Sequence, residues 1–104
     1  MRGDIYEMKA PRDARGHEQR GNRYAVVVQS DLLPLSTWLV APTSTSARPT
    51  SFRPEVEVSG EPTLVLVEQT AAVDPQRLGG LVGHLTQREM AAVNQALKAV
   101  LDLP

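Results

Sequence analysis

Five short apolar segments recur along the chain, and each is bounded by a stretch rich in Gly, Pro, Ser, Thr or Asn. Runs of four or five residues that alternate with polar residues, or that are β-branched throughout, are typical of strands, and the residues between them favour turns. The segments predict strands at residues 4–8, 24–28, 38–41, 55–58 and 63–67. Five short strands at this spacing favour a small twisted β-barrel.

The carboxy-terminal part carries a helix signal instead. Thr86 and Glu89 have the spacing of a capping box, in which each side chain accepts a hydrogen bond from the backbone amide of the other residue. Apolar residues then recur at helical spacing through Leu101, and Pro104 follows. The expected fold is therefore mainly β with a C-terminal α-helix. Residues 77–85 contain three glycines, and the pattern leaves open whether 81–85 adds a short strand.

Composition excludes several classes of protein. A chain of 104 residues with 41% hydrophobic content fits one domain, residues 1–104, with a modest core. The absence of cysteine excludes disulfides, a thiolate nucleophile and Cys-based metal sites. His17 and His84 are far apart in sequence, so no metal is expected. The apolar runs are too short to span a bilayer and no signal-type segment is visible, which predicts a soluble cytoplasmic protein.

The net charge of -1 hides an asymmetry along the chain. Residues 1–53 carry eight Lys/Arg and five Asp/Glu, whereas residues 54–104 carry three and seven. The basic excess lies mainly in residues 9–23. That segment could meet a phosphate backbone, although a solvated loop is the simpler interpretation of the charge alone.

Arg23 and the residues after Pro42 are candidates for phosphate chemistry. RNA is cleaved when its own 2′-hydroxyl attacks phosphorus, so a protein needs to accept a proton, stabilise the phosphorus oxygens and assist the leaving oxygen. A guanidinium suits the second task. Arg23 precedes one predicted strand, and Thr43, Ser44 and Thr45 follow another that is expected to end at Pro42. Alone, such residues are more often structural.

Several blocks in the chain, taken together, resemble a known family. They are Arg2-Gly3-Asp4-Ile5-Tyr6, residues 16–23 running into Ala25-Val26-Val27-Val28, Pro42-Thr43, and Leu66-Val67-Glu68-Gln69 with Val73-Asp74 and Arg77-Leu78. In this order they resemble the MazF/PemK-type toxins of type II toxin–antitoxin systems. The resemblance implies an SH3-like small β-barrel of the CcdB/PemK kind, usually a homodimer. It also implies an endoribonuclease that cuts single-stranded RNA without metal or cofactor and leaves a 2′,3′-cyclic phosphate.

The resemblance assigns roles to particular residues. Arg23 occupies the position of the catalytic arginine, and Thr43 that of the threonine whose hydroxyl bonds the scissile phosphate. Glu18 and Gln19, next to Arg20, match a loop beside the cleft, where they would position RNA or support Arg23.

Two further assignments follow from it. Glu68 and Gln69 match a segment near the dimer-facing side of the groove, where a structural role and an RNA contact are equally open. The implied partner is a cognate MazE-like antitoxin, acidic and partly disordered, whose tail would suit the basic segment 9–23.

Three positions depart from the family pattern. Tyr24 replaces a usual proline and is either strand packing or a stacking surface for a base. His17 replaces a small hydroxyl residue, and our hypothesis is that it takes part in proton transfer or contacts phosphate, against the simpler interpretation of an exposed loop histidine. Ala71 stands where relatives often have a basic residue, which leaves RNA contacts there in doubt.

Two other functions fit the same fold. A CcdB-like toxin binds DNA gyrase through a carboxy-terminal tryptophan, and the only tryptophan here is Trp38, which disfavours that function. A catalytically inactive barrel could bind only RNA or the antitoxin, but the presence of both Arg23 and Thr43 speaks against it. The sequence leaves the cleavage site open, and with it the choice among messenger, ribosomal and transfer RNA.

Overall fold

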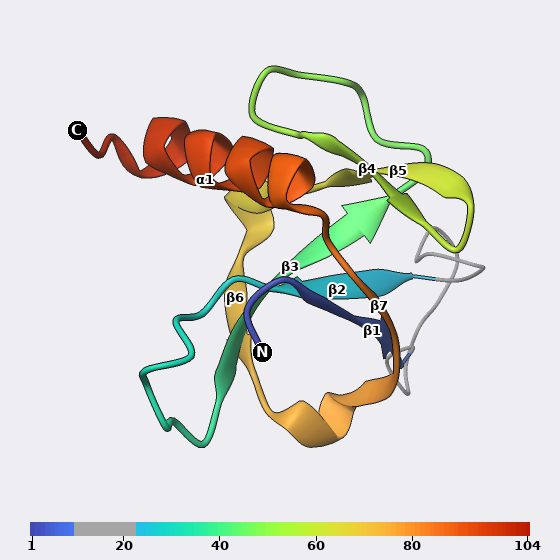
Figure 1. The fold of residues 1–104 in the computed structure, drawn as a ribbon, viewed down its shortest axis with the longest axis vertical. Helices are drawn as coiled ribbons and strands as arrows, with labels where there is room; N and C mark the ends of the chain where they lie inside the picture. Colours follow the sequence, from blue (N-terminus) through green and yellow to red (C-terminus); the bar gives the residue numbers. More distant parts are fainter. Residues whose placement is uncertain (10–22) are drawn as a thin grey trace.

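Strand β3 (Trp38–Ser44) organises the sheet because it pairs with three other strands. One of its edges pairs with β2 (Tyr24–Val27), and the other pairs first with β6 (Ala71–Val73) and then with β5 (Glu61–Val65). The main path of the sheet runs β4-β5-β3-β2-β1-β7 and curls as Figure 1 shows. The remaining strands are β1 (Asp4–Met8), β4 (Glu55–Val58) and β7 (Leu78–His84). The computed structural model describes residues 1–9 and 23–104.

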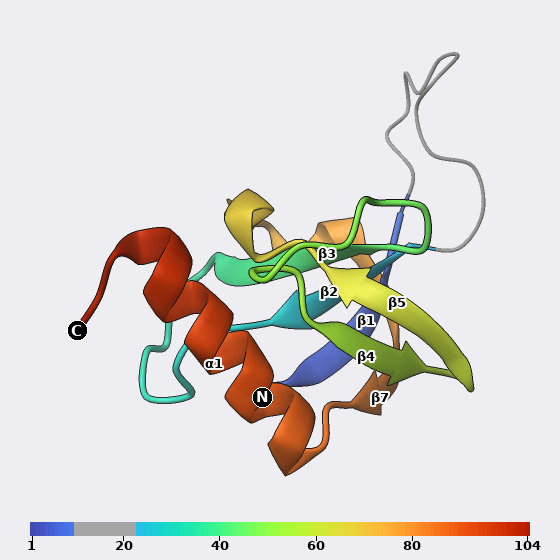
Figure 2. The ribbon, with the colours of Figure 1, turned by 90° about the horizontal axis from the view of Figure 1, so that it is seen from above.

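Helix α1 (Gln87–Leu101) lies along one side of this sheet (Figure 2). The predicted capping box is present: the Thr86 hydroxyl accepts from the Glu89 amide at 3.1 Å, and the Glu89 carboxylate accepts from the Thr86 amide at 2.8 Å. The second oxygen of the same carboxylate accepts from the backbone amide of Glu57 at 2.8 Å. One side chain therefore both starts the helix and ties it to β4.

The core has two parts, one on each face of β2. Val26 packs with Val65 of β5 and with Val93 of α1, whereas Ala25 and Val27 pack on the other face with Val40 and Leu78. Burial on both faces explains why residues 25–28 are apolar without alternation.

The predicted end of the third strand at Pro42 is wrong, because β3 continues through Pro42 to Ser44. The carbonyl of Pro42 accepts from the Leu66 amide at 2.8 Å, so it points to the edge of β3 that pairs with β6 and β5. The nitrogen of Pro42 points to the same edge, because the nitrogen and the carbonyl of one residue face the same neighbour in an antiparallel pair. The missing amide hydrogen therefore leaves the β2 ladder intact. Thr43 is consequently a strand residue with fixed neighbours on both sides.

The predicted bounds of the last of the five strands also need correction. The strand predicted at residues 63–67 is β5, Glu61–Val65, because the turn before it needs only Ser59 and Gly60, both with positive φ (52° and 82°). Val67 instead starts the short 3₁₀ helix η1 (Val67–Gln69), and a second such turn, η2 (Pro75–Arg77), precedes β7.

Strand β6 has only three residues, too few for a pattern that predicts it. The short strand that the sequence left open at residues 81–85 is part of β7, which starts earlier, at Leu78. A Cβ added at Gly79 would lie 3.0 Å from the Glu7 Cβ, so this glycine lets β7 approach β1. In the part of the chain that the structure describes, no helix is long and apolar enough to cross a membrane.

Candidate functional site

The backbone next to Arg23 and the side chain of Thr43, twenty residues apart in sequence, lie side by side at the end of the sheet. The register that pairs Ala25 with Pro42 sets Tyr24 opposite Thr43. The Tyr24 amide, which is the peptide link to Arg23, donates to the Thr43 hydroxyl oxygen at 3.2 Å. Because the oxygen accepts this bond, the hydroxyl hydrogen stays available to donate to another group.

The environment of Arg23 is unusual for a cation. Its Nε is buried and has no hydrogen-bond partner among residues 1–9 and 23–104. Burial lowers the pKa of its guanidinium below the ordinary value, because desolvation disfavours the charged form. An unsatisfied buried donor costs about 1–3 kcal/mol. A bound anion that accepts from this group would remove that cost.

The Ser44 hydroxyl shapes the turn that follows β3. Its oxygen accepts from the backbone amides of Ser46 and Ala47 at 3.2 and 3.0 Å, and the side chain is buried. Such side-chain to backbone bonds close a tight turn. The structure thus gives Ser44 a role in loop conformation, while Thr45 beside it is exposed.

Sequence reasoning missed one ion pair next to this site. Arg53, in the loop between β3 and β4, donates to one oxygen of Glu68 through both Nε (3.0 Å) and Nη2 (2.6 Å). This hydrogen bond from Arg53 holds the pKa of Glu68 below its ordinary value of 4.5, despite partial burial. The two residues are fifteen positions apart, and no spacing rule links a loop arginine to a residue of a 3₁₀ turn, so no sequence pattern predicts the pair.

No group of three or more acidic or histidine side chains that could hold a metal ion occurs within the described ranges 1–9 and 23–104. The described groups of this region are a guanidinium, a hydroxyl and backbone amides, which together suit an anionic ligand.

Comparison with known proteins decides the family. The model of PemK-like, MazF-like toxins of type II toxin–antitoxin systems matches residues 1–101. The chain belongs to this family. A relative from Mycobacterium tuberculosis, named "Putative toxin Rv3098A", is 43% identical over 104 residues, which cover 99% of this chain and 98% of the relative.

Solved structures share the fold of this toxin at low sequence identity. A mycobacterial endoribonuclease in complex with its cognate antitoxin superposes with a TM-score of 0.81 at 19% identity, covering 100% of this chain and 96% of the other. The Mycobacterium tuberculosis toxin MazF-mt6 gives 0.76 at 18% identity and 99% coverage of both chains. MazF from Deinococcus radiodurans gives 0.77 at 20% identity, covering 98% and 96%. The predicted SH3-like, PemK-like fold is thereby confirmed.

The remaining predicted residues of the toxin differ in their surroundings. Tyr24 is half-buried and packs against the larger core cluster, as expected of strand packing. Gln69 is exposed in η1, and Ala71 is exposed in β6. RNA contacts of Tyr24, Ser44, Thr45 and Gln69 stay predictions. His17, Glu18, Gln19 and Arg20 lie outside the described residues.

Proposed function

We propose that this MazF/PemK-like toxin is an endoribonuclease that cuts single-stranded RNA without a metal and leaves a 2′,3′-cyclic phosphate. One observation carries the proposal. The peptide amide that follows Arg23 donates to the Thr43 hydroxyl oxygen, and the partly buried guanidinium of Arg23 has an Nε with no partner among residues 1–9 and 23–104. Two solved structures of the same fold are endoribonucleases from mycobacterial species, which agrees with the proposal.

The expected position of the scissile phosphate follows from strand alternation. Thr43 lies on the same face of the sheet as Tyr24 and Val26, because Tyr24 packs with Val26 and stands opposite Thr43. Arg23 stands one residue before β2, and continued alternation would put its side chain on the opposite face from Thr43. A phosphate that contacts both side chains must therefore bind over the end of β2, where the sheet stops.

The two side chains would divide the work of phosphoryl transfer. The Arg23 guanidinium donates to the phosphorus oxygens and stabilises their growing charge as the 2′-oxygen attacks. The Thr43 hydroxyl donates its free hydrogen to the same phosphate. Proton transfer by His17, and positioning of RNA by Glu18, Gln19 and Arg20, stay predictions.

Partners and location are proposed on the same basis. A toxin of a type II system acts with an antitoxin, and the mycobacterial endoribonuclease of the same fold was solved in complex with its cognate antitoxin. We propose a MazE-like antitoxin as partner, a homodimer as the assembly and the cytoplasm as the location, where single-stranded RNA is the substrate.

Incubating the purified toxin with single-stranded RNA in EDTA tests the proposal. Because the proposed site uses only protein donors, we expect discrete fragments whose ends carry a 2′,3′-cyclic phosphate, measured by gel mapping and mass spectrometry. An RNA with a 2′-deoxy nucleotide at the cleaved position is the control and should stay intact. Intact wild-type substrate in EDTA that is cut only after Mg²⁺ is added would contradict the metal-free chemistry.

The same experiment separates the alternatives. A CcdB-like toxin would leave RNA intact and bind gyrase, and an inactive barrel would bind RNA without cutting it. The family match to PemK-like and MazF-like toxins favours cleavage over both.

A further inference from the structure

The loop between β3 and β4, residues 45–54, is fastened at both ends. At its start, the Ser44 hydroxyl accepts from the amides of Ser46 and Ala47. At its end, Arg53 donates to Glu68 through Nε and Nη2 at 3.0 and 2.6 Å. Arg53 also donates through Nη1 to the carbonyl of Arg48 at 3.0 Å, so one guanidinium links the middle of the loop to η1.

These contacts connect the loop, through η1 and β5, back to Thr43 in the candidate site. Thr43 pairs with Val65 in β5, and β5 leads through Leu66 into η1 and Glu68. From Glu68 the Arg53 pair returns to the loop, and the loop returns to Thr43. The end of the loop is held to β5 by the Val65 amide, which donates to the Pro54 carbonyl at 2.9 Å, and the ion pair adds a side-chain link from the loop to η1.

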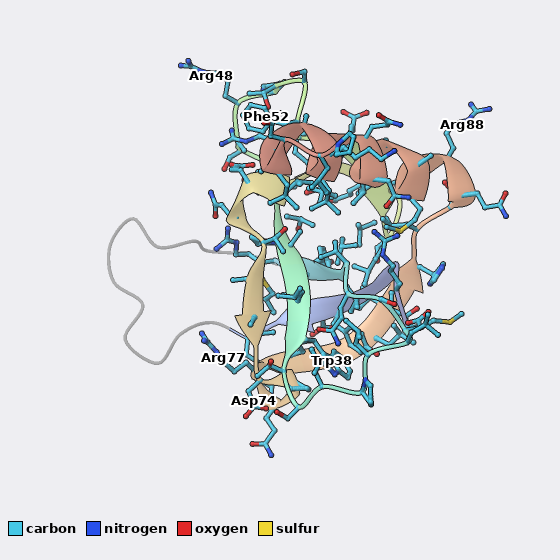
Figure 3. The ribbon with its side chains drawn as sticks, turned by 90° about the vertical axis from the view of Figure 1, so that its left-hand side faces the viewer. Trp38, Arg48, Phe52, Asp74, Arg77 and Arg88 are labelled. Carbon is cyan, nitrogen blue, oxygen red and sulfur yellow. The ribbon has the colours of Figure 1, made fainter. Side chains whose placement is uncertain are left out.

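We propose that Arg53 and Glu68 are positioning residues that hold the β3–β4 loop in the conformation that binds substrate. This inference rests on the proposed function for its substrate, which is single-stranded RNA. The loop would then present Arg48 to the RNA backbone as a phosphate contact. Figure 3 shows the Arg48 side chain projecting away from the body of the molecule, and that side chain is exposed.

The surroundings of Glu68 favour positioning over proton transfer. Both hydrogen bonds from Arg53 go to Oε2, whereas Oε1 is buried without a partner among the residues that the structure describes. Arg53 lowers the pKa of Glu68, so the carboxylate stays ionised at neutral pH and accepts a proton poorly. The side chains of Arg53 and Glu68 are only 21% and 25% exposed, which limits screening of the pair by solvent.

Hydrogen exchange and cleavage kinetics of the full chain test the inference together. The variants are Arg53→Met, Glu68→Gln and the double variant. Arg88→Met and Glu61→Gln are the controls, because both residues are exposed and neither takes part in the contacts described above. We expect the amides of Ser46, Ala47 and Arg53 to exchange about tenfold faster in each single variant, since a hydrogen bond to a charged group is lost. The double variant should show no further increase, because the two residues act as a pair.

The kinetic readout separates positioning from structure or chemistry. In the same variants KM for a short single-stranded RNA should rise while kcat and its pH dependence stay as in the wild type. Unchanged exchange in the loop, or additive effects in the double variant, would overturn the pairing. A lower kcat with an altered pH profile would make Glu68 a proton-transfer group instead. If the wild type cuts no RNA, the proposed function fails while the exchange data still test the pair.

Discussion

Replacing Arg23 with alanine is expected to reduce RNA cleavage by about 10²–10³-fold, the usual effect of removing a donor that stabilises transition-state charge. The free energy of unfolding should not fall, because the variant removes a partly buried cation whose Nε lacks a partner in the described residues. Initial cleavage rates on a short RNA, together with urea unfolding, measure both quantities.

Arg88→Ala is the matched control for this variant. Arg88 is an exposed arginine in the first turn of α1, and Figure 3 shows it at the opposite side of the molecule from Arg48. Its loss should leave cleavage unchanged. Cleavage that persists at the wild-type rate in Arg23→Ala would place the chemistry elsewhere in the chain.

Replacing Leu85 with alanine is expected to cost about 2–5 kcal/mol of unfolding free energy, the range for truncating a buried leucine. Leu85 is 3% exposed and belongs to the larger core cluster, between the end of β7 and the cap of α1. Because small domains are stable by only about 5–15 kcal/mol, this loss should be visible as a large shift of the urea midpoint.

Leu32→Ala serves as the control, because Leu32 is 89% exposed in the loop between β2 and β3. It should change the unfolding free energy by no more than about 0.5 kcal/mol. A loss below about 1 kcal/mol for Leu85→Ala would show that this residue contributes little to the core.

The strands and the helix could be predicted wherever one local pattern decided the structure. β1 and β4 have the predicted bounds, and the start of α1 follows from Thr86 and Glu89 alone. The prediction was wrong at Pro42 because local rules treat proline as a strand end. Proline is tolerated there because β3 pairs with two different strands along one edge, and this pairing depends on the tertiary structure rather than on local sequence.

In the candidate site, too, some features follow from the sequence and others depend on the tertiary structure. The family resemblance names Arg23 and Thr43, whose roles stay predictions, and the register of β2 and β3 sets the backbone next to Arg23 beside Thr43. The structural role of Ser44 and the pair of Arg53 with Glu68 depend on loop conformation. No pattern of spacing contains that information.

A double-mutant cycle between Arg23 and Thr43 tests most directly whether the two side chains act on one phosphate. Thr43→Val keeps the buried shape and removes the hydroxyl, and Thr63→Val, at a buried threonine whose hydroxyl has no partner in the described chain, is its control. We expect the rate loss of Arg23→Ala plus Thr43→Val to be much smaller than the product of the two single losses, as for residues that act as a unit. Losses that multiply fully, with Thr63→Val unchanged, would mean that the two groups act independently and would contradict a shared phosphate site.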